Sequence, residues 1–186
     1  MKPSSVKLFL GCVFSILLYC SSCVDDVDFD RLDEVVLTPR LDADLLFFTV
    51  NYTSLINEEI VNNQIILRDT TQLNFLDDEV TQENLVEVEI TYRATNSFNQ
   101  SITNRSIFLS ENGVIQYEII FPVSGSNSGE PVVTEFTETV TQQELQSIRN
   151  SIQLANEVII DAGTLPQTGE LNLQSKAIYS LEFSDL

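Results

Sequence analysis

The stretch LVEVEITYRAT, residues 85–95, decides the fold class of this chain. Every second residue is apolar, namely Val86, Val88, Ile90, Tyr92 and Ala94. The residues between them are mostly charged or hydroxylated. Side chains on a β-strand alternate between the two faces of a sheet, so this pattern predicts a strand that is buried on one face and wet on the other. One solvated face is typical of an antiparallel sheet.

Short apolar segments with turn residues between them occur on both sides of this stretch. We expect the further strands to cover 44–55, 64–75, 101–110, 114–122, 132–140, 157–163 and 171–183. Asn112 and Gly113 separate two of these segments and supply the positive backbone dihedral angles of a tight hairpin. The pattern therefore predicts seven to nine strands, as in a β-sandwich.

One segment has a helical period instead. Thr141 and Glu144 have the spacing of a capping box, and Leu145, Ile148 and Ile152 share one stripe of a helix. A helix is therefore expected over 142–155. Together these patterns predict an all-β domain over 34–186, an antiparallel and immunoglobulin-like β-sandwich with one short helical crossover.

The first residues have the layout of a secretory signal. Lys2 and Lys7 precede an apolar run over 8–19, and small residues follow it. A membrane-spanning helix needs about 20 apolar residues, which is more than this run provides. We therefore expect residues 1–22 to be a cleaved signal peptide.

Ser21 and Ser22, directly before Cys23, resemble the lipobox of bacterial lipoproteins, in which cleavage occurs before a lipidated cysteine. This resemblance implies that Cys23 carries the lipid anchor. Cys20 stands where the lipobox usually has Leu or Val, and choosing Cys20 as the anchor would place the bulky Tyr19 beside the cut. An ordinary signal peptide with incidental cysteines is the alternative. Acyl chains hold a protein at the outer membrane by burying methylene groups.

The segment CVDDVDFD, residues 23–30, resembles the export signal of surface-exposed lipoproteins of Bacteroidetes, particularly of flavobacteria. Its acidic residues are Asp25, Asp26, Asp28 and Asp30. The resemblance implies that 23–33 is an acidic tether and that the protein faces the cell exterior. A solvated linker is the alternative. An EF-hand is excluded, because Arg31 and Leu37 occupy the glycine and glutamate positions of that loop.

The segments 74–101 and 108–123 resemble uncharacterised surface-exposed lipoproteins of the flavobacterial type in their general residue pattern. That resemblance implies no activity. It includes the triplet Asn96-Ser97-Phe98, which a turn residue beside a buried aromatic ring explains without a function.

Composition excludes several functions. The formal net charge is −19, so neither nucleic acid nor anionic lipid headgroups are expected to bind directly. The sequence contains no histidine, and the mature chain would keep no thiol besides the lipidated one. The usual bases, nucleophiles and zinc ligands are therefore missing, and we expect the protein not to be an enzyme and to need no cofactor.

Three function classes stay open. The first is a non-catalytic binding or structural module, whose partner would be another envelope protein or a glycan. The second is a carrier of an apolar ligand, with an internal pocket lined by Phe47, Phe48, Ile90, Tyr92 or Ile120. The third is a small glycosidase that uses two carboxylates.

The sequence also contains two features that indicate calcium binding or glycosylation. Calcium is a weak alternative, because 40–44 and 76–80 place carboxylates near expected strand ends. The segment DTT, residues 69–71, resembles the motif at which Bacteroidetes glycosylate exported proteins, which implies a glycan on Thr70.

Overall fold

The stretch 85–95 forms β4 (Leu85–Asn96) in the interior of a four-stranded sheet. The computed structural model describes residues 36–166 and 168–184, and Val36–Phe183 forms one compact unit. β4 pairs with β9 (Glu170–Leu181) on one side and with β7 (Val132–Val140) on the other. β1 (Arg40–Asn51) pairs with the far side of β9 and is an edge of this sheet.

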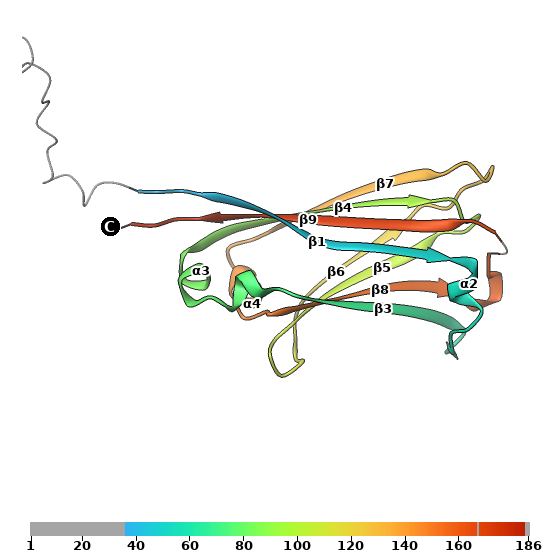
Figure 1. Ribbon diagram of the computed structural model, residues 1–186, viewed down its shortest axis with the longest axis horizontal. Coiled ribbons are helices and arrows are strands. Elements are labelled where there is room, and N and C mark those ends of the chain that lie inside the picture. The colour runs from blue at the N-terminus through green and yellow to red at the C-terminus, as the bar shows by residue number, and fades with distance from the viewer. Residues whose placement is uncertain (1–35, 167, 185–186) are drawn as a thin grey trace, which may run out of the picture. The chain divides into compact units, whose positions relative to one another are not determined.

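A five-stranded sheet packs against the first, and Figure 1 shows the two layers. Its order is β2 (Ile60–Val61), β3 (Gln64–Gln72), β8 (Gln153–Asp161), β5 (Ile102–Leu109) and β6 (Ile115–Val123). All pairings in both sheets are antiparallel. The predicted antiparallel β-sandwich is confirmed.

The connectivity is that of a jelly roll. Without the short β2, the two sheets read β1-β9-β4-β7 and β3-β8-β5-β6, so the first strand lies beside the last. In an immunoglobulin domain the first strand lies beside the second instead. The finer expectation of an immunoglobulin-like order was therefore wrong, because alternation along a strand defines its faces but not its neighbours.

The core is formed by the side chains that point from each sheet toward the other. On β4 the inward residues Val88, Ile90, Tyr92 and Ala94 are fully buried, as predicted. On β9 the inward set begins at Leu171 and ends at Leu181, and its parity also agrees with the prediction. A register shift after Leu85 buries that residue in place of Val86.

Aromatic side chains close one long edge of the sandwich. Phe121 on β6 stacks on Phe136 of β7, with ring centroids 4.7 Å apart. The Tyr117 hydroxyl donates to Glu138 Oε1 at 2.8 Å, which links the same two strands. Burial and this hydrogen bond raise the pKa of Tyr117 above its ordinary value. The two sheets are therefore joined at the β6 and β7 edge.

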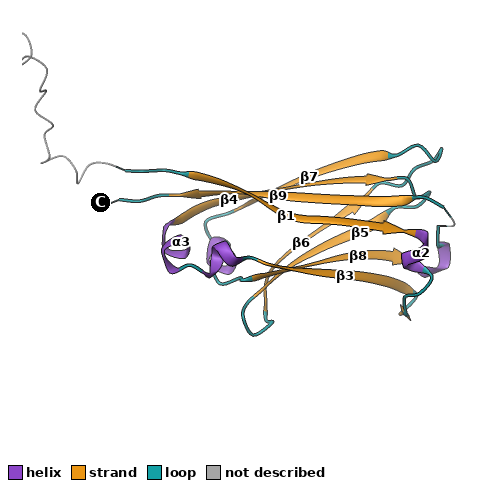
Figure 2. Cartoon of the chain, in the orientation of Figure 1, coloured by secondary structure: helices purple, strands orange, loops and turns teal. Residues whose placement is uncertain are grey.

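In the described part of the chain, three short α-helices lie at connections between the sheets, at the ends of the sandwich in Figure 2. They are α2 (Tyr52–Leu55), α3 (Glu79–Asn84) and α4 (Leu145–Arg149). The expected helix over 142–155 is thus a single turn, and it is not the only helix. The helix ends because the backbone of Ile152 bonds to Leu109 and Leu73 in a sheet-like manner, at 3.0 and 2.8 Å. Pairing between strands overrides the local helical pattern there.

Two hairpins differ in how well the sequence predicted them. β5 and β6 are joined at the predicted turn, but only Gly113 has a positive φ, of 73°. The sequence reading missed the turn between β2 and β3, where Asn62 and Asn63 have φ values of 52° and 62°. Asparagine tolerates this left-handed conformation better than other residues with a side chain, so two consecutive asparagines were the available signal.

The triplet Asn96-Ser97-Phe98 holds together the loops at one end of the sandwich. Asn96 is fully buried and donates through Nδ2 to the carbonyls of Gln100 and Ser124, at 3.1 and 2.9 Å. Its Oδ1 accepts from the Phe98 amide at 2.9 Å. Ser97 Oγ accepts from the Glu170 amide at 2.8 Å. The predicted structural role of the triplet is confirmed.

We expect Asn96→Leu to lower the free energy of unfolding by about 3 kcal/mol, because three backbone groups would lose their partner and each such loss costs about 1–3 kcal/mol when buried. Asn99→Leu is the matched control and should change stability by less than about 0.5 kcal/mol, since Asn99 is exposed. Urea unfolding followed by circular dichroism measures both. Equal stabilities of the two variants would contradict this role of Asn96.

Candidate functional site

The residues of the expected lipid anchor and export signal lie outside the described part of the chain. These are Cys23, Asp25, Asp26, Asp28 and Asp30, together with the segments 1–22 and 23–33. Thr70 is described and lies exposed on β3, opposite Ala155 of β8. Its amide donates to Asp69 Oδ1 at 2.8 Å.

The carboxylates considered for calcium have other positions than expected. Asp42 and Asp44 lie inside β1 rather than at a strand end, because β1 begins at Arg40. Asp78 caps α3 by accepting from the amide and hydroxyl of Thr81, at 2.8 and 2.9 Å. Within residues 36–166 and 168–184, no three acidic or thiol side chains form a group that could hold a metal ion.

The residues proposed for an internal apolar pocket are not brought together. Ile90 and Tyr92 are fully buried in the core, and Phe48 packs against it. In contrast, Phe47 and Ile120 are 69% and 57% exposed, on the outer faces of opposite sheets. This set of residues therefore does not support the carrier hypothesis.

A groove of 710 Å³ opens at the bulge in β1. The register between β1 and β9 shifts between Asp44 and Leu46, so Leu45 is an extra residue and both leucines are buried. The bulge reverses the parity of the strand, and Phe47 consequently points outward. The extra residue thus lets both leucines of the local sequence DLLFF be buried within one strand.

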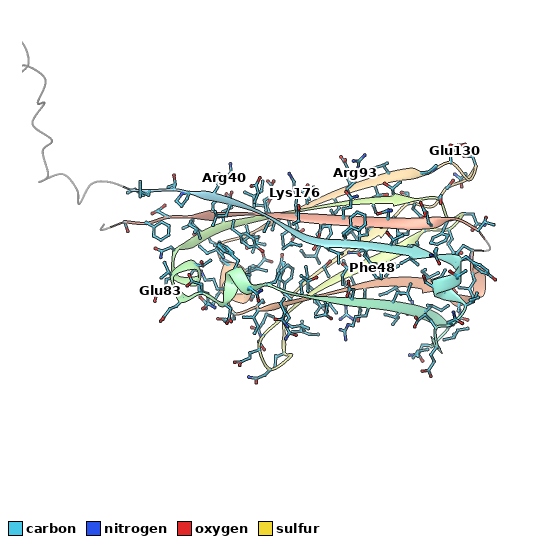
Figure 3. The ribbon with its side chains drawn as sticks, viewed as in Figure 1. Arg40, Phe48, Glu83, Arg93, Glu130 and Lys176 are labelled. Carbon is cyan, nitrogen blue, oxygen red and sulfur yellow. The ribbon has the colours of Figure 1, made fainter. Side chains whose placement is uncertain are left out.

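Side chains from all four strands line the groove on the outer face of this sheet. One register row contains Phe47 on β1, Gln174 on β9, Arg93 on β4 and Glu135 on β7. The neighbouring row contributes Asp44, Lys176 and Thr91. Figure 3 shows Lys176 and Arg93 projecting from the layer of this sheet, whereas Phe48 lies between the layers.

The lining also includes Asp69 and Thr71 of β3, the facing strand at this edge of the sandwich. Asp69 has the inward parity of Ile65 and Leu67, yet it is exposed. Aromatic rings fill the opposite edge, but at this edge polar side chains occupy inward positions. The groove therefore extends from the outer sheet face, past the bulge, to the open edge between β1 and β3.

Polar residues continue from Asp69 into the core. Asp69 is paired in register with Asn156, and Asn156 with Ser106. Ser106 Oγ donates to Asn156 Oδ1 at 2.8 Å and accepts from Asn104 Nδ2 at 3.2 Å. Ser175, which belongs to the groove lining, is buried, and among the described residues its Oγ and Asn156 Nδ2 have no hydrogen-bond partner. Buried polar atoms of this kind call for a specific explanation.

Charges in the groove are mixed. The lining includes three negatively charged residues, Asp44, Asp69 and Glu135, and two positively charged residues, Arg93 and Lys176. Arg93 Nε lies 3.7 Å from Glu135 Oε1, beyond hydrogen-bond distance, and both side chains are more than half exposed. Their donors and acceptors are therefore open to a ligand.

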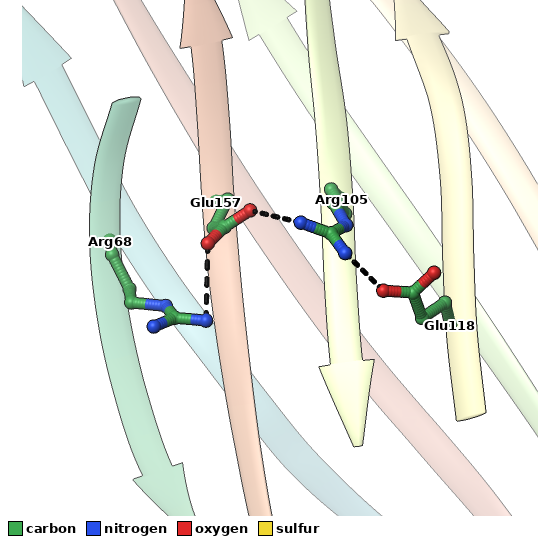
Figure 4. A network of polar contacts seen from close by, with 4 residues as sticks. All are labelled: Arg68, Arg105, Glu118 and Glu157. Carbon is green, nitrogen blue, oxygen red and sulfur yellow. Dashed lines mark hydrogen bonds and ion pairs between the residues drawn. The ribbon is translucent and has the colours of Figure 1, made fainter. Parts of the chain in front are cut away.

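A second charged cluster lies on the outer face of the five-stranded sheet and is shown in Figure 4. Glu157 is 7% exposed, forms an ion pair with Arg68 on one side and accepts a hydrogen bond from Arg105 on the other, each at 3.1 Å. Arg105 also contacts Glu118, which raises the pKa of the guanidinium further. Each carboxylate here has a cationic partner, so the cluster is structural.

Sequence reasoning predicted part of this site. Arg93 was assigned to the wet face of its strand, and it lies there. Gln174 and Lys176 have the parity opposite to the buried residues of β9, so the same signal could have found them. Phe47 was assigned to the interior, which is wrong, because the bulge cannot be seen in the sequence.

The solved structures that resemble this chain share little sequence identity with it and have TM-scores below 0.5. No family model and no curated protein matches the chain. A protein assigned as secreted from Parabacteroides distasonis is similar in structure, with a TM-score of 0.45 and 13% identity over 62% of this chain and 38% of that one. The infectious bursal disease virus Gx strain structure has a TM-score of 0.44 and 9% identity, over 78% of this chain and 32% of that one. This chain thus spans well under half the length of either protein.

A search for membrane-spanning helices gives a negative result in the described part of the chain. No helix there combines the length and the apolar character needed to cross a bilayer.

We expect Glu157→Gln to lower the free energy of unfolding by about 1–3 kcal/mol, because two arginines would lose a charged acceptor in a nearly buried place. Glu118→Gln is the control and should cost less than about 1 kcal/mol, since Glu118 contacts one arginine and is more exposed. Thermal unfolding of both variants checks this. A loss as large for Glu118→Gln as for Glu157→Gln would show that burial of Glu157 is unimportant.

Proposed function

We propose that the protein is a lipid-anchored, non-catalytic binding module at the outer membrane, displayed toward the cell exterior. The groove at the β1 bulge is the observation that carries the binding role. It is open, and its side chains come from five strands of two sheets. Its exposed ring and loosely paired charges stabilise little in the fold itself.

The anchoring part of the proposal rests on the sequence around Cys23. The lipobox-like residues before Cys23 and the acidic run after it are read by different machinery, so their roles are separable. The bridge between Leu37 and Phe183 marks where the sandwich begins. An acidic tether over 23–33 would then connect the lipid to the domain.

A carboxylate glycosidase is the second candidate. Asp44, Asp69 and Glu135 line one groove, and two carboxylates are the catalytic groups that such chemistry needs. We favour binding over hydrolysis because all three acids are exposed, lie on three different strands, and share the groove with Arg93 and Lys176.

Cys23→Ala should leave the protein uncleaved or without lipid, since Ser21 and Ser22 place the cut before Cys23, whereas Cys20 follows the bulky Tyr19. Cys20→Ala is the matched control and should be lipidated normally. Replacement of Asp25, Asp26, Asp28 and Asp30 by alanine should retain the lipid but leave the protein facing the periplasm. Metabolic labelling with a fatty acid measures lipidation, and protease added to intact cells measures exposure. Equal digestion of the wild type and the four-Asp variant would reduce the acidic run to a linker.

The purified protein should release no sugar from glycan substrates. Reducing-end assays on neutral and acidic polysaccharides measure this, with Asp44→Asn, Asp69→Asn and Glu135→Gln as the informative variants. Turnover by the wild type that is lost in one of these variants would establish the glycosidase and overturn the non-catalytic assignment.

A further inference from the structure

Phe47 lines the groove, and its ring contributes little to the hydrophobic core. It is the most exposed large apolar side chain of the described residues, at 69%. Burying a phenylalanine side chain stabilises a protein, and this contribution is forgone here. Its position follows from the bulge, which buries Leu45 and Leu46 and turns the next residue outward. A ligand that covers the ring would gain that burial energy.

The groups around the ring can pair with hydroxyls. In the same register row, Gln174 offers a carboxamide, Arg93 a guanidinium and Glu135 a carboxylate. The row thus presents planar groups that donate, accept or do both, on strands about 4.8 Å apart. The second row adds Lys176 and Thr91. A ligand rich in hydroxyl groups would satisfy donors and acceptors alike.

Other ligand classes fit less well. A polyanion would meet Asp44, Asp69 and Glu135 in the groove of a chain whose net charge is −19. A wholly apolar ligand would remove Arg93, Glu135 and Gln174 from water without giving them partners, which is costly. A sugar ring has an apolar face of C–H groups and a rim of hydroxyls, and it matches one aromatic ring beside polar planar groups.

A separate observation at the inner end of the groove points the same way. Ser175 lines the groove, and its buried Oγ has no hydrogen-bond partner among the described residues. Asn156, the register neighbour of Asp69, is not a lining residue, but its Nδ2 also has no hydrogen-bond partner in the described part of the chain. The polar character of the site therefore continues to the open edge beside β3 and is not limited to surface charges.

We propose that this groove binds a neutral glycan, with the Phe47 ring against the face of a sugar and with Arg93, Gln174 and Glu135 bonded to its hydroxyls. This inference rests on the proposed binding function and names its ligand class. Phe47 contributes affinity, and the polar row contributes orientation and specificity.

The test uses the mature protein in a sugar-free nonionic detergent, on native gels that contain a soluble polysaccharide. The neutral probes are xylan, mannan, laminarin and dextran, and dextran sulfate is the charged counterpart of dextran. We expect retardation by at least one neutral probe and none by dextran sulfate. Retardation by dextran sulfate alone, or by none of the neutral probes, would overturn the inference.

Variants place the binding in the groove. Phe47→Ala should reduce the association constant by about tenfold or more, as expected for the loss of a buried phenylalanine ring. Phe47→Tyr should retain binding, since it keeps the ring. Ile120→Ala is the matched control, because Ile120 is similarly exposed on the outer sheet face away from the groove, and it should bind as the wild type does. Unchanged affinity of Phe47→Ala would assign the glycan to another surface.

The outcome is separable from that of the proposed function. Digestion of the protein on intact cells reports display, whatever the ligand is. A displayed protein that fails to bind neutral glycans refutes the ligand class alone. A glycan-binding protein that stays protected from protease refutes surface display alone.

Discussion

β1 pairs with β9 at one edge of the four-stranded sheet, and the groove depends on an irregularity in that pairing. The ladder runs from Arg40 opposite Ser180 to Asn51 opposite Glu170, and one bulge interrupts it after Asp44. Before the bulge the even-numbered residues face outward, and after it the odd-numbered residues do. A regular strand would bury Phe47 and expose Leu46, and it would remove the aromatic ring from the groove.

The two long edges of the sandwich have different chemistry. Phe121, Phe136 and Tyr117 join the sheets at the β6 and β7 edge, where little room for a ligand is left. At the opposite edge, Asp69 and Ser175 occupy inward positions, so the sheets are not sealed by apolar packing. We therefore expect substitutions of the exposed groove residues to cost the fold little.

The domain achieves order without covalent links, since the sequence has three cysteines and all of them precede the described residues. Burial of apolar side chains supplies most of the stability. Two buried polar residues fix the positions of neighbouring segments. Asn96 satisfies backbone groups from separate loops, and Glu157 holds two arginines across neighbouring strands. Both replace water contacts by internal hydrogen bonds at buried positions, where losing a partner is expensive.

The sequence by itself determined the class of fold, most strand positions and the solvated face on which Arg93 lies. Period-two alternation is a local property, and each strand reveals its buried face through its own residues. The β5 and β6 hairpin and the role of Asn96 were predictable for the same reason, because turns are encoded by adjacent residues.

Only the tertiary structure decided the strand order, the length of α4 and the place of Phe47. Strand neighbours depend on contacts between residues far apart in the chain, such as Leu41 with Tyr179. The segment after Asn150 has a helical pattern but becomes β8, because β3 and β5 offer it backbone partners. The site itself belongs to this second group, since a bulge in one strand and the register of its neighbours bring its residues together.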